Sequence, residues 1–148
     1  MSDARSVSIL LVEDDPGHAR LIQKNLKRAG LTNPIIHAAD GQAALDILFG
    51  EGEFQHQEPL DTLLVLLDLN MPVLDGYQVL KAMKSDARTR NIPVIILTTT
   101  DDTREVERCY ELGCSVYITK PVDYDQFSNA IRQLGLFISI VTVPQRGR

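Results

Sequence analysis

Carboxylate side chains crowd the end of one apolar stretch near the start of the chain. The segment "ILLVEDDP" runs from four apolar residues directly into Glu13, Asp14 and Asp15, and a second apolar run, "TLLVLLD", ends in Asp68. Like charges a few ångströms apart repel by about 1 kcal/mol even in water, and by more where protein displaces solvent. Helix capping, solvation or a bound cation must therefore offset this repulsion.

Hydroxyl and ammonium groups follow two further apolar runs. "PVIILT" ends in Thr98, and "SVYIT", which contains Tyr117, is followed by Lys120. Each residue alone has an ordinary explanation: Thr98 as a strand residue, Tyr117 as a half-buried strand aromatic, and Lys120 as a solvated charge. Asp68 alone fits a turn, and Asp15 before a proline fits a helix cap.

Taken together, the same residues form a pattern that chance seldom produces. Several acids with carbonyl and water oxygens make a hard-oxygen site suited to Mg²⁺, which keeps several of its waters and partners phosphoryl groups. A hydroxyl and an ammonium at neighbouring strand ends add donors for the oxygens of such a group. The interpretation requires that the ends of four segments meet in one crevice.

Five short apolar segments rich in branched residues alternate with segments of helical spacing. The predicted strands are 8–12, 34–38, 62–68, 93–98 and 115–119. The predicted helices carry the apolar stripes Ala19/Ile22/Leu26/Ala29, Ala44/Ile47/Leu48, Val79/Leu80/Met83, Val106/Cys109/Tyr110 and Phe127/Ala130/Ile131/Leu134. Glycines at 30, 50 and 113 are expected to end three of these helices.

Strict alternation of strands and helices predicts an open, mostly parallel sheet with helices on both faces. The third and fourth strands are continuously apolar, as strands covered on both faces are. Ligands of such sheets bind beyond the carboxyl ends of the strands. We therefore expect the polar residues described above to gather at that edge.

The composition limits the class of protein. A chain of 148 residues with 44% hydrophobic content fits one domain spanning 1–148, and a formal net charge of −5 argues against direct binding to nucleic acid. Cys109 and Cys114 have no metal-site spacing, so free buried thiols are expected. The polar N-terminus and the lack of a run of about 20 apolar residues predict a cytoplasmic protein without a membrane segment.

The motifs "LLVEDDP", "LLDLNMPVLDGY", "VIILTTTDD" and "VYITKPV" resemble, in order and spacing, those of the receiver domains of two-component response regulators. The resemblance covers roughly residues 8–134. It implies a flavodoxin-like α/β fold, a doubly wound parallel sheet of five strands in the order 2-1-3-4-5 with five helices. It also implies a signalling protein that catalyses only its own phosphorylation and slow dephosphorylation, not an enzyme that turns over a substrate.

The resemblance assigns roles to individual residues. The aspartate before "LNMP", Asp68, is the expected phosphoacceptor, which receives the phosphoryl group of a sensor histidine kinase in a reaction that depends on Mg²⁺. The expected metal ligands are Glu13, Asp14, Asp68 and the carbonyl group of Asn70. Asp15 falls outside this set.

Two further residues are expected to act with Asp68, and two to transmit its phosphorylation. Lys120 and Thr98 would neutralise and hydrogen-bond the phosphoryl oxygens. Thr98 would then move toward the phosphoryl group, and Tyr117 would rotate inward. These movements would reshape the face made by the fourth helix, the fifth strand and the fifth helix.

The segment "LFISIVTVP" (136–144) follows the expected last helix and is strongly apolar. An exposed run of this kind marks an interface, although it can also fold back on its own core. With the long polar loop at 50–59, it resembles the small stand-alone regulators paired with cyanobacterial phytochromes. That resemblance implies a phytochrome as the kinase and a homodimer built from the switching face and this extension.

Two other functions remain open from the residues. A degenerate receiver would act as a protein-binding module that needs no phosphorylation, but such proteins usually lose the acids that are present here. A phosphohydrolase of the haloacid dehalogenase type would carry a second acid two positions after the nucleophile, where this chain has Asn70.

Overall fold

The computed structural model describes residues 8–28, 33–50, 63–69, 71, 74–99 and 102–119, together with 129 and 132. Its strands are β1 (Ser8–Val12), β2 (Ile35–Ala38), β3 (Leu63–Leu67), β4 (Val94–Thr98) and β5 (Val116–Thr119). Its helices are α1 (Pro16–Arg28), α2 (Gly41–Phe49), α3 (Gly76–Lys84) and α4 (Thr103–Leu112). Each predicted strand is found within one residue of its expected ends. Of the expected fifth helix only residues 129 and 132 are described, and both are helical. The 50–59 loop beyond Gly50 and the 136–144 segment lie outside the described residues.

The strands form one parallel sheet in the order β2-β1-β3-β4-β5. This is the order implied by the resemblance. Because all five strands run the same way, their carboxyl ends meet at one edge. In the sheet β1 lies between β2 and β3, and Val12, its last residue, pairs with Ala38 on one side and Leu67 on the other.

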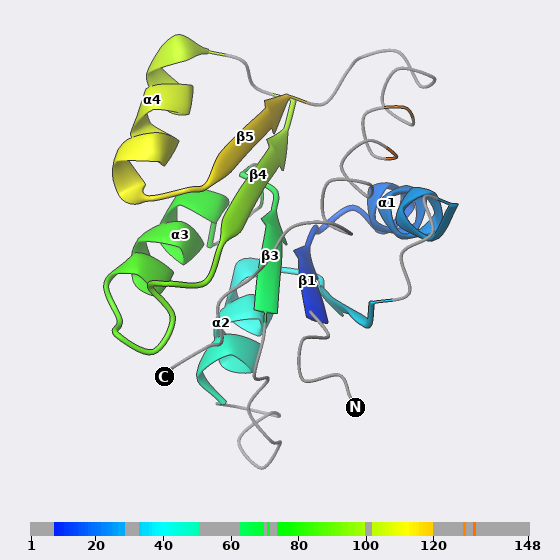
Figure 1. The fold of residues 1–148 in the computed structure, drawn as a ribbon, viewed down its shortest axis with the longest axis horizontal. Coiled ribbons are helices and arrows are strands. Elements are labelled where there is room, and N and C mark those ends of the chain that lie inside the picture. Colours follow the sequence, from blue (N-terminus) through cyan, green and yellow to red (C-terminus); the bar gives the residue numbers. More distant parts are fainter. Residues whose placement is uncertain are drawn as a thin grey trace.

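Alternate residues of the central strands enter two separate cores, one on each face of the sheet. Ile9 and Leu11 pack with α1, whereas Leu10 and Val12 pack with α2, α3 and α4. Figure 1 shows α1 on one side of the sheet and α2, α3 and α4 on the other. Burial on both faces explains why β3 and β4 are apolar at consecutive positions rather than at every second one.

Capping residues mark the ends of α2 and α4 and the start of α3. Gly50 and Gly113 adopt the left-handed conformation after α2 and α4, with φ of 65° and 106°, which glycine adopts without the strain of a Cβ. At the start of α3, Asp75 and Gln78 form a reciprocal capping box. The predictions for Gly50 and Gly113 are therefore confirmed.

The predicted apolar stripe of α4 is wrong at one position. Tyr110 was expected to be buried with Cys109, but it is 48% exposed, and Cys109 is the one fully buried residue of this helix. The Tyr110 hydroxyl accepts a hydrogen bond from the Tyr117 amide (3.2 Å). Since β5 is the outermost strand of the sheet, this amide faces its unpaired edge, and a tyrosine can cover it while part of its ring stays in solvent.

Both cysteines are free and buried, as predicted. Burial, with smaller contributions from nearby Cys114 and Glu105, raises the pKa of Cys109 to about 11, which disfavours the reactive thiolate form. No helix within the described parts of the chain has the length and apolar character needed to cross a bilayer.

Candidate metal centre

The register of the sheet places two acidic segments side by side. Val12 pairs with Leu67, so the residues that follow them, Glu13 and Asp68, leave neighbouring strands at the same level. The backbone continues the strand pattern by one residue, because the Asp68 amide donates to the Val12 carbonyl (3.0 Å) and the Glu13 amide donates to the Ala38 carbonyl (3.1 Å). Acids 55 positions apart in the sequence are thereby brought together.

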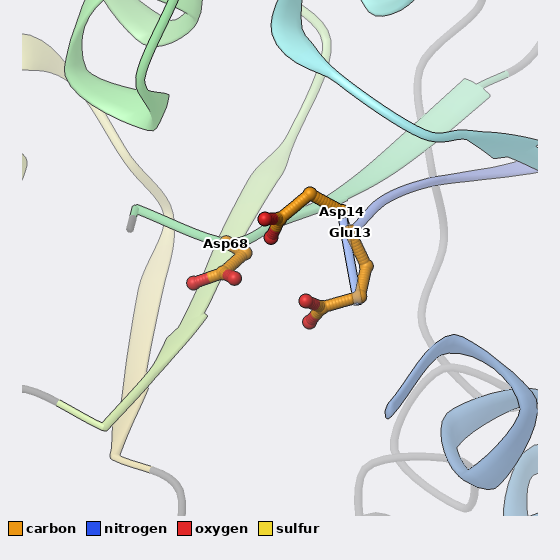
Figure 2. Close-up of side chains that lie close together, drawn as sticks. All are labelled: Glu13, Asp14 and Asp68. Carbon is orange, nitrogen blue, oxygen red and sulfur yellow. The ribbon is translucent and has the colours of Figure 1, made fainter. Parts of the chain in front are cut away.

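Three carboxylates form a cluster at this edge. Glu13, Asp14 and Asp68 each contribute one oxygen, and these oxygens lie within 4.8 Å of one another. Figure 2 shows the three side chains at the ends of β1 and β3. Glu13 and Asp68 are almost inaccessible to solvent, with 1% and 7% exposure, whereas Asp14 is partly exposed.

This arrangement fits a divalent cation. Three like charges at such distances repel one another, and the burial of two of them weakens the screening by water. Carboxylate oxygens are the ligands that Mg²⁺, Ca²⁺ and Mn²⁺ prefer. The residues present therefore suit a hard cation, and Glu13, Asp14 and Asp68 are the described groups that would hold it.

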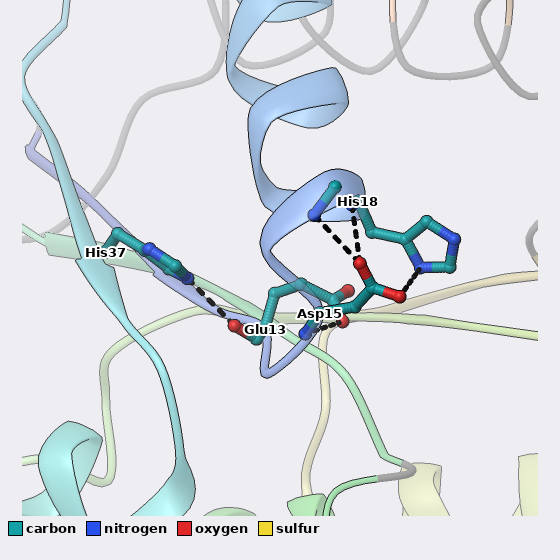
Figure 3. Close-up of polar contacts among 5 residues, drawn as sticks. Glu13, Asp15, His18 and His37 are labelled. Carbon is teal, nitrogen blue, oxygen red and sulfur yellow. Dashed lines mark hydrogen bonds and ion pairs between the residues drawn. The ribbon is translucent and has the colours of Figure 1, made fainter.

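Asp15 has a different role from its two neighbours, as the sequence predicted. Its carboxylate accepts hydrogen bonds from the amides of Gly17 (2.8 Å) and His18 (3.1 Å), at the start of α1 (Figure 3). These amides have no partner inside the helix, so a carboxylate at this position caps it. The first helix begins at Pro16, and Asp15 is not part of the cluster.

Two glycines allow the backbone after Asp68 to pack closely, and sequence reasoning missed this role. A Cβ on Gly76 would lie 2.5 Å from the Asp68 carbonyl oxygen, and a Cβ on Gly41 would lie 2.4 Å from the Leu74 carbonyl oxygen. Either contact is too short for any other residue type. The backbone of Asp68 thus packs against the first residue of α3, and that of Leu74 packs against the first residue of α2.

The structure describes two of the other four predicted site residues. Thr98 is fully buried at the carboxyl end of β4, the edge where the acids lie. Tyr117 is half-buried, pairs with Ile96 of β4, and packs against the core shared by α2, α3 and α4. Lys120 and Asn70 lie outside the described residues, so their expected roles stay predictions.

His37 approaches the cluster from β2 and was not singled out from the sequence. Its Nε2 atom lies 2.8 Å from the Glu13 carbonyl oxygen. A histidine within the apolar strand "IIHA" carries no local signal for this contact, because the contact depends on how β2 pairs with β1.

Comparisons with known proteins agree with this geometry. Residues 9–132 match the model of the response regulator receiver domain. A receiver domain from Rhodospirillum rubrum has a crystal structure that is 54% identical to this chain, with a TM-score of 0.88; the alignment covers 95% of this chain and 99% of that one. The similarity extends over nearly the whole of both chains.

Two relatives are response regulators with informative structures. Rcp1 of Synechocystis sp. is 35% identical over 137 residues, which cover 92% of each chain, and its Mn²⁺-bound structure has a TM-score of 0.85 at 34% identity, covering 93% and 98%. The phosphorylated cyanobacterial phytochrome response regulator RcpA has a TM-score of 0.84 at 35% identity, covering 93% and 97%. The chain therefore belongs to the family of response regulator receiver domains and is a signalling protein of the two-component type.

Proposed function

We propose that this chain accepts a phosphoryl group from a sensor histidine kinase on Asp68, in a reaction that requires Mg²⁺. The observation that carries the proposal is the cluster of Glu13, Asp14 and Asp68, in which one carboxylate comes from β3 and two come from the end of β1. The relatives support it, since Rcp1 has a Mn²⁺-bound structure and RcpA a phosphorylated one.

The proposed reaction needs little covalent chemistry from the protein. An Asp68 oxygen forms a bond to phosphorus while the bond between phosphorus and the kinase histidine breaks, and the electron pair stays on that nitrogen. A cation held by Glu13, Asp14, Asp68 and the Asn70 carbonyl would supply positive charge that screens the phosphoryl oxygens. The Lys120 ammonium and the Thr98 hydroxyl would neutralise and hydrogen-bond these oxygens, so that catalysis is mainly electrostatic positioning.

Phosphorylation would act as a switch because it adds negative charge and new acceptor oxygens at Asp68. Thr98 would move toward them, and Tyr117 would rotate inward to fill the space. The amide of Tyr117 is hydrogen-bonded to the Tyr110 hydroxyl of α4, so a change at β5 would reach α4 directly. The altered face would then favour a different partner or a different oligomer.

The partner and the assembly are proposed from the relatives. RcpA is a phytochrome response regulator, so we propose a phytochrome as the kinase of this chain. We also propose that residues 1–148 form a single receiver domain with its core at 8–134. The homodimer interface would consist of α4, β5, the expected fifth helix and the 136–144 segment.

The test uses acetyl phosphate, a small phosphoryl donor, with Mg²⁺ and intact-protein mass spectrometry. The wild type should gain the mass of one phosphoryl group, and Asp68→Asn should gain none. Asp15→Asn is the matched control, because asparagine also caps helices and Asp15 lies outside the cluster; it should be labelled like the wild type. Equal labelling of Asp68→Asn and the wild type would refute the assignment, and no labelling of the wild type would favour a phosphorylation-independent binding module.

A further inference from the structure

The backbone of Glu13 is held on both of its polar atoms by β2. Its amide donates to the Ala38 carbonyl (3.1 Å), and its carbonyl lies 2.8 Å from Nε2 of His37 (Figure 3). The first contact extends the β1–β2 pairing by one residue. The second is made by a side chain, so it depends on the residue type at position 37.

The direction of this hydrogen bond follows from elementary chemistry. A carbonyl oxygen can only accept, so Nε2 of His37 must carry the hydrogen and donate it. Both the neutral tautomer with hydrogen on Nε2 and the charged imidazole meet this condition. The bond is therefore available without any change in protonation.

The position of His37 on the strand explains why its ring reaches Glu13. In the sheet His37 pairs with Leu11, two residues before Glu13, and successive side chains of a strand point to opposite faces. Its neighbour Ile35, two residues earlier, packs into the core under α1, as Leu11 does. The imidazole thus lies on the α1 side of the sheet, where the chain leaves β1 and turns toward α1.

Repulsion among the carboxylates of the cluster acts on the residues of this turn. Glu13 and Asp14 follow the last residue of β1, and their like charges and that of Asp68 push them away from β3. Hydrogen bonds from β2 to the Glu13 backbone oppose that displacement. A ligand segment that is held before the cation arrives loses less conformational freedom when it binds.

We propose that His37 is a positioning residue of the metal centre, which holds the Glu13 carbonyl so that the carboxylates of Glu13 and Asp14 stay in reach of Asp68. This inference rests on the proposed function, since it concerns the same site. It assigns no contact between His37 and the cation or the phosphoryl group.

The experiment measures Mg²⁺ binding by titration calorimetry, with Mg²⁺ alone as the ligand. His37→Phe keeps a planar ring but removes the donor, whereas His37→Gln keeps an N–H donor at the end of the side chain. We expect His37→Phe to lower the Mg²⁺ affinity about tenfold, at the lower end of the range for residues that orient metal ligands. His37→Gln should recover most of that loss.

His18→Phe provides the matched control. His18 lies on α1 beside the same turn, and its ring is 3.9 Å from the Asp15 carboxylate rather than bonded to the backbone of a cluster residue. This variant should bind Mg²⁺ like the wild type. Urea unfolding of all variants in EDTA shows whether each is folded and how far its stability changes without the cation.

The outcomes separate this inference from the proposed function. If the wild type binds Mg²⁺ and is labelled on Asp68, but His37→Phe binds Mg²⁺ as tightly as the wild type, only the inference is overturned. The same holds if His18→Phe weakens binding as much as His37→Phe, or if His37→Gln, folded in EDTA, is as weak as His37→Phe. If the wild type neither binds Mg²⁺ nor is labelled, the proposed function fails and the inference fails with it.

Discussion

Charged side chains are arranged differently at the two ends of the sheet. At the carboxyl end, Glu13, Asp14 and Asp68 each place one carboxylate oxygen within 4.8 Å of the others. At the amino end, charged side chains find partners within the segment that joins α3 to β4. Lys84 Nζ donates to the carbonyls of Arg90 (2.9 Å) and Ile92 (3.0 Å), and Asp86 forms an ion pair with Arg88 (2.9 Å).

This difference distinguishes a structural role from a functional one. Polar groups that only support a fold are satisfied within it, because an unsatisfied buried group costs free energy. The carboxyl end instead concentrates like charges, two of them on buried side chains. Such an arrangement is compatible with a stable fold when a charge of opposite sign completes it, which a bound cation would do.

The largest expected effect concerns the amino end. Lys84→Met should lower the free energy of unfolding by about 2 kcal/mol, because it removes the donor of two hydrogen bonds to backbone carbonyls. Burial lowers the pKa of Lys84, so part of this loss is offset by the end of its desolvation. Urea unfolding measures the change, and Mg²⁺ affinity should stay unaltered if this end is purely structural.

Lys81→Met is the control for Lys84, since Lys81 lies on the same helix and is exposed. It should change the stability little. A weaker Mg²⁺ affinity in Lys84→Met would break the comparison, because it would show that the two ends of the sheet are coupled.

A smaller effect is expected at the carboxyl end, and its sign depends on the cation. In EDTA, Asp14→Asn should raise the free energy of unfolding by about 1 kcal/mol, because it removes one of three mutually repelling charges. Mg²⁺ should stabilise the wild type and have little effect on this variant, since binding to the folded state alone stabilises it. Urea unfolding with EDTA and with Mg²⁺ gives both differences.

Glu107→Gln tests whether the effect of Asp14→Asn is local. It removes one negative charge from an exposed position of α4, and the whole chain carries a net charge of −5. An equal gain in stability from Glu107→Gln would attribute the effect to net charge instead of to the cluster. A loss of stability in Asp14→Asn in EDTA would contradict the repulsion itself.

The smallest effect is a pH dependence at the amino end. Hydrogen bonds from the Arg88 side chain and backbone lower the pKa of Asp86 to about 2, from an ordinary value of 3.8. A lowered pKa in the folded state means that the stabilisation is complete above the unfolded value and is lost as the pH falls from about 4 toward 2. Asp86→Asn should therefore unfold with a slightly shallower dependence on pH over this range.

Urea midpoints of the wild type and Asp86→Asn at several pH values isolate this contribution, because other carboxylates titrate in both proteins. The difference should be small, since Arg88 is largely exposed and water screens the pair. Identical slopes would show that the ion pair contributes nothing to stability.

Much of the fold and part of the site were predictable from local patterns. The five strands, the caps formed by Asp15 and Gly50, and the free cysteines were all found where expected. The gathering of Glu13, Asp14 and Asp68 followed from a general rule for parallel sheets together with the family motifs. These features depend on apolar runs, turn residues and the order of segments, which can be read from neighbouring positions.

The contacts that sequence reasoning missed all join one helix or strand to the end of another. The His37 side chain hydrogen-bonds to the Glu13 carbonyl, and Gly76 leaves room for the Asp68 backbone. The Tyr110 hydroxyl accepts a hydrogen bond from the Tyr117 amide at the edge of the sheet. A histidine in a strand, a glycine before a helix and a tyrosine on a helical stripe carry no sign of these partners.

The sequence alone determined which segments become strands and helices, and which acids stand at the strand ends, because hydrophobic periodicity and capping act over a few residues. Only the tertiary structure decided which oxygens and donors meet. Register and packing set those distances, and they depend on how every strand and helix fits its neighbours at once.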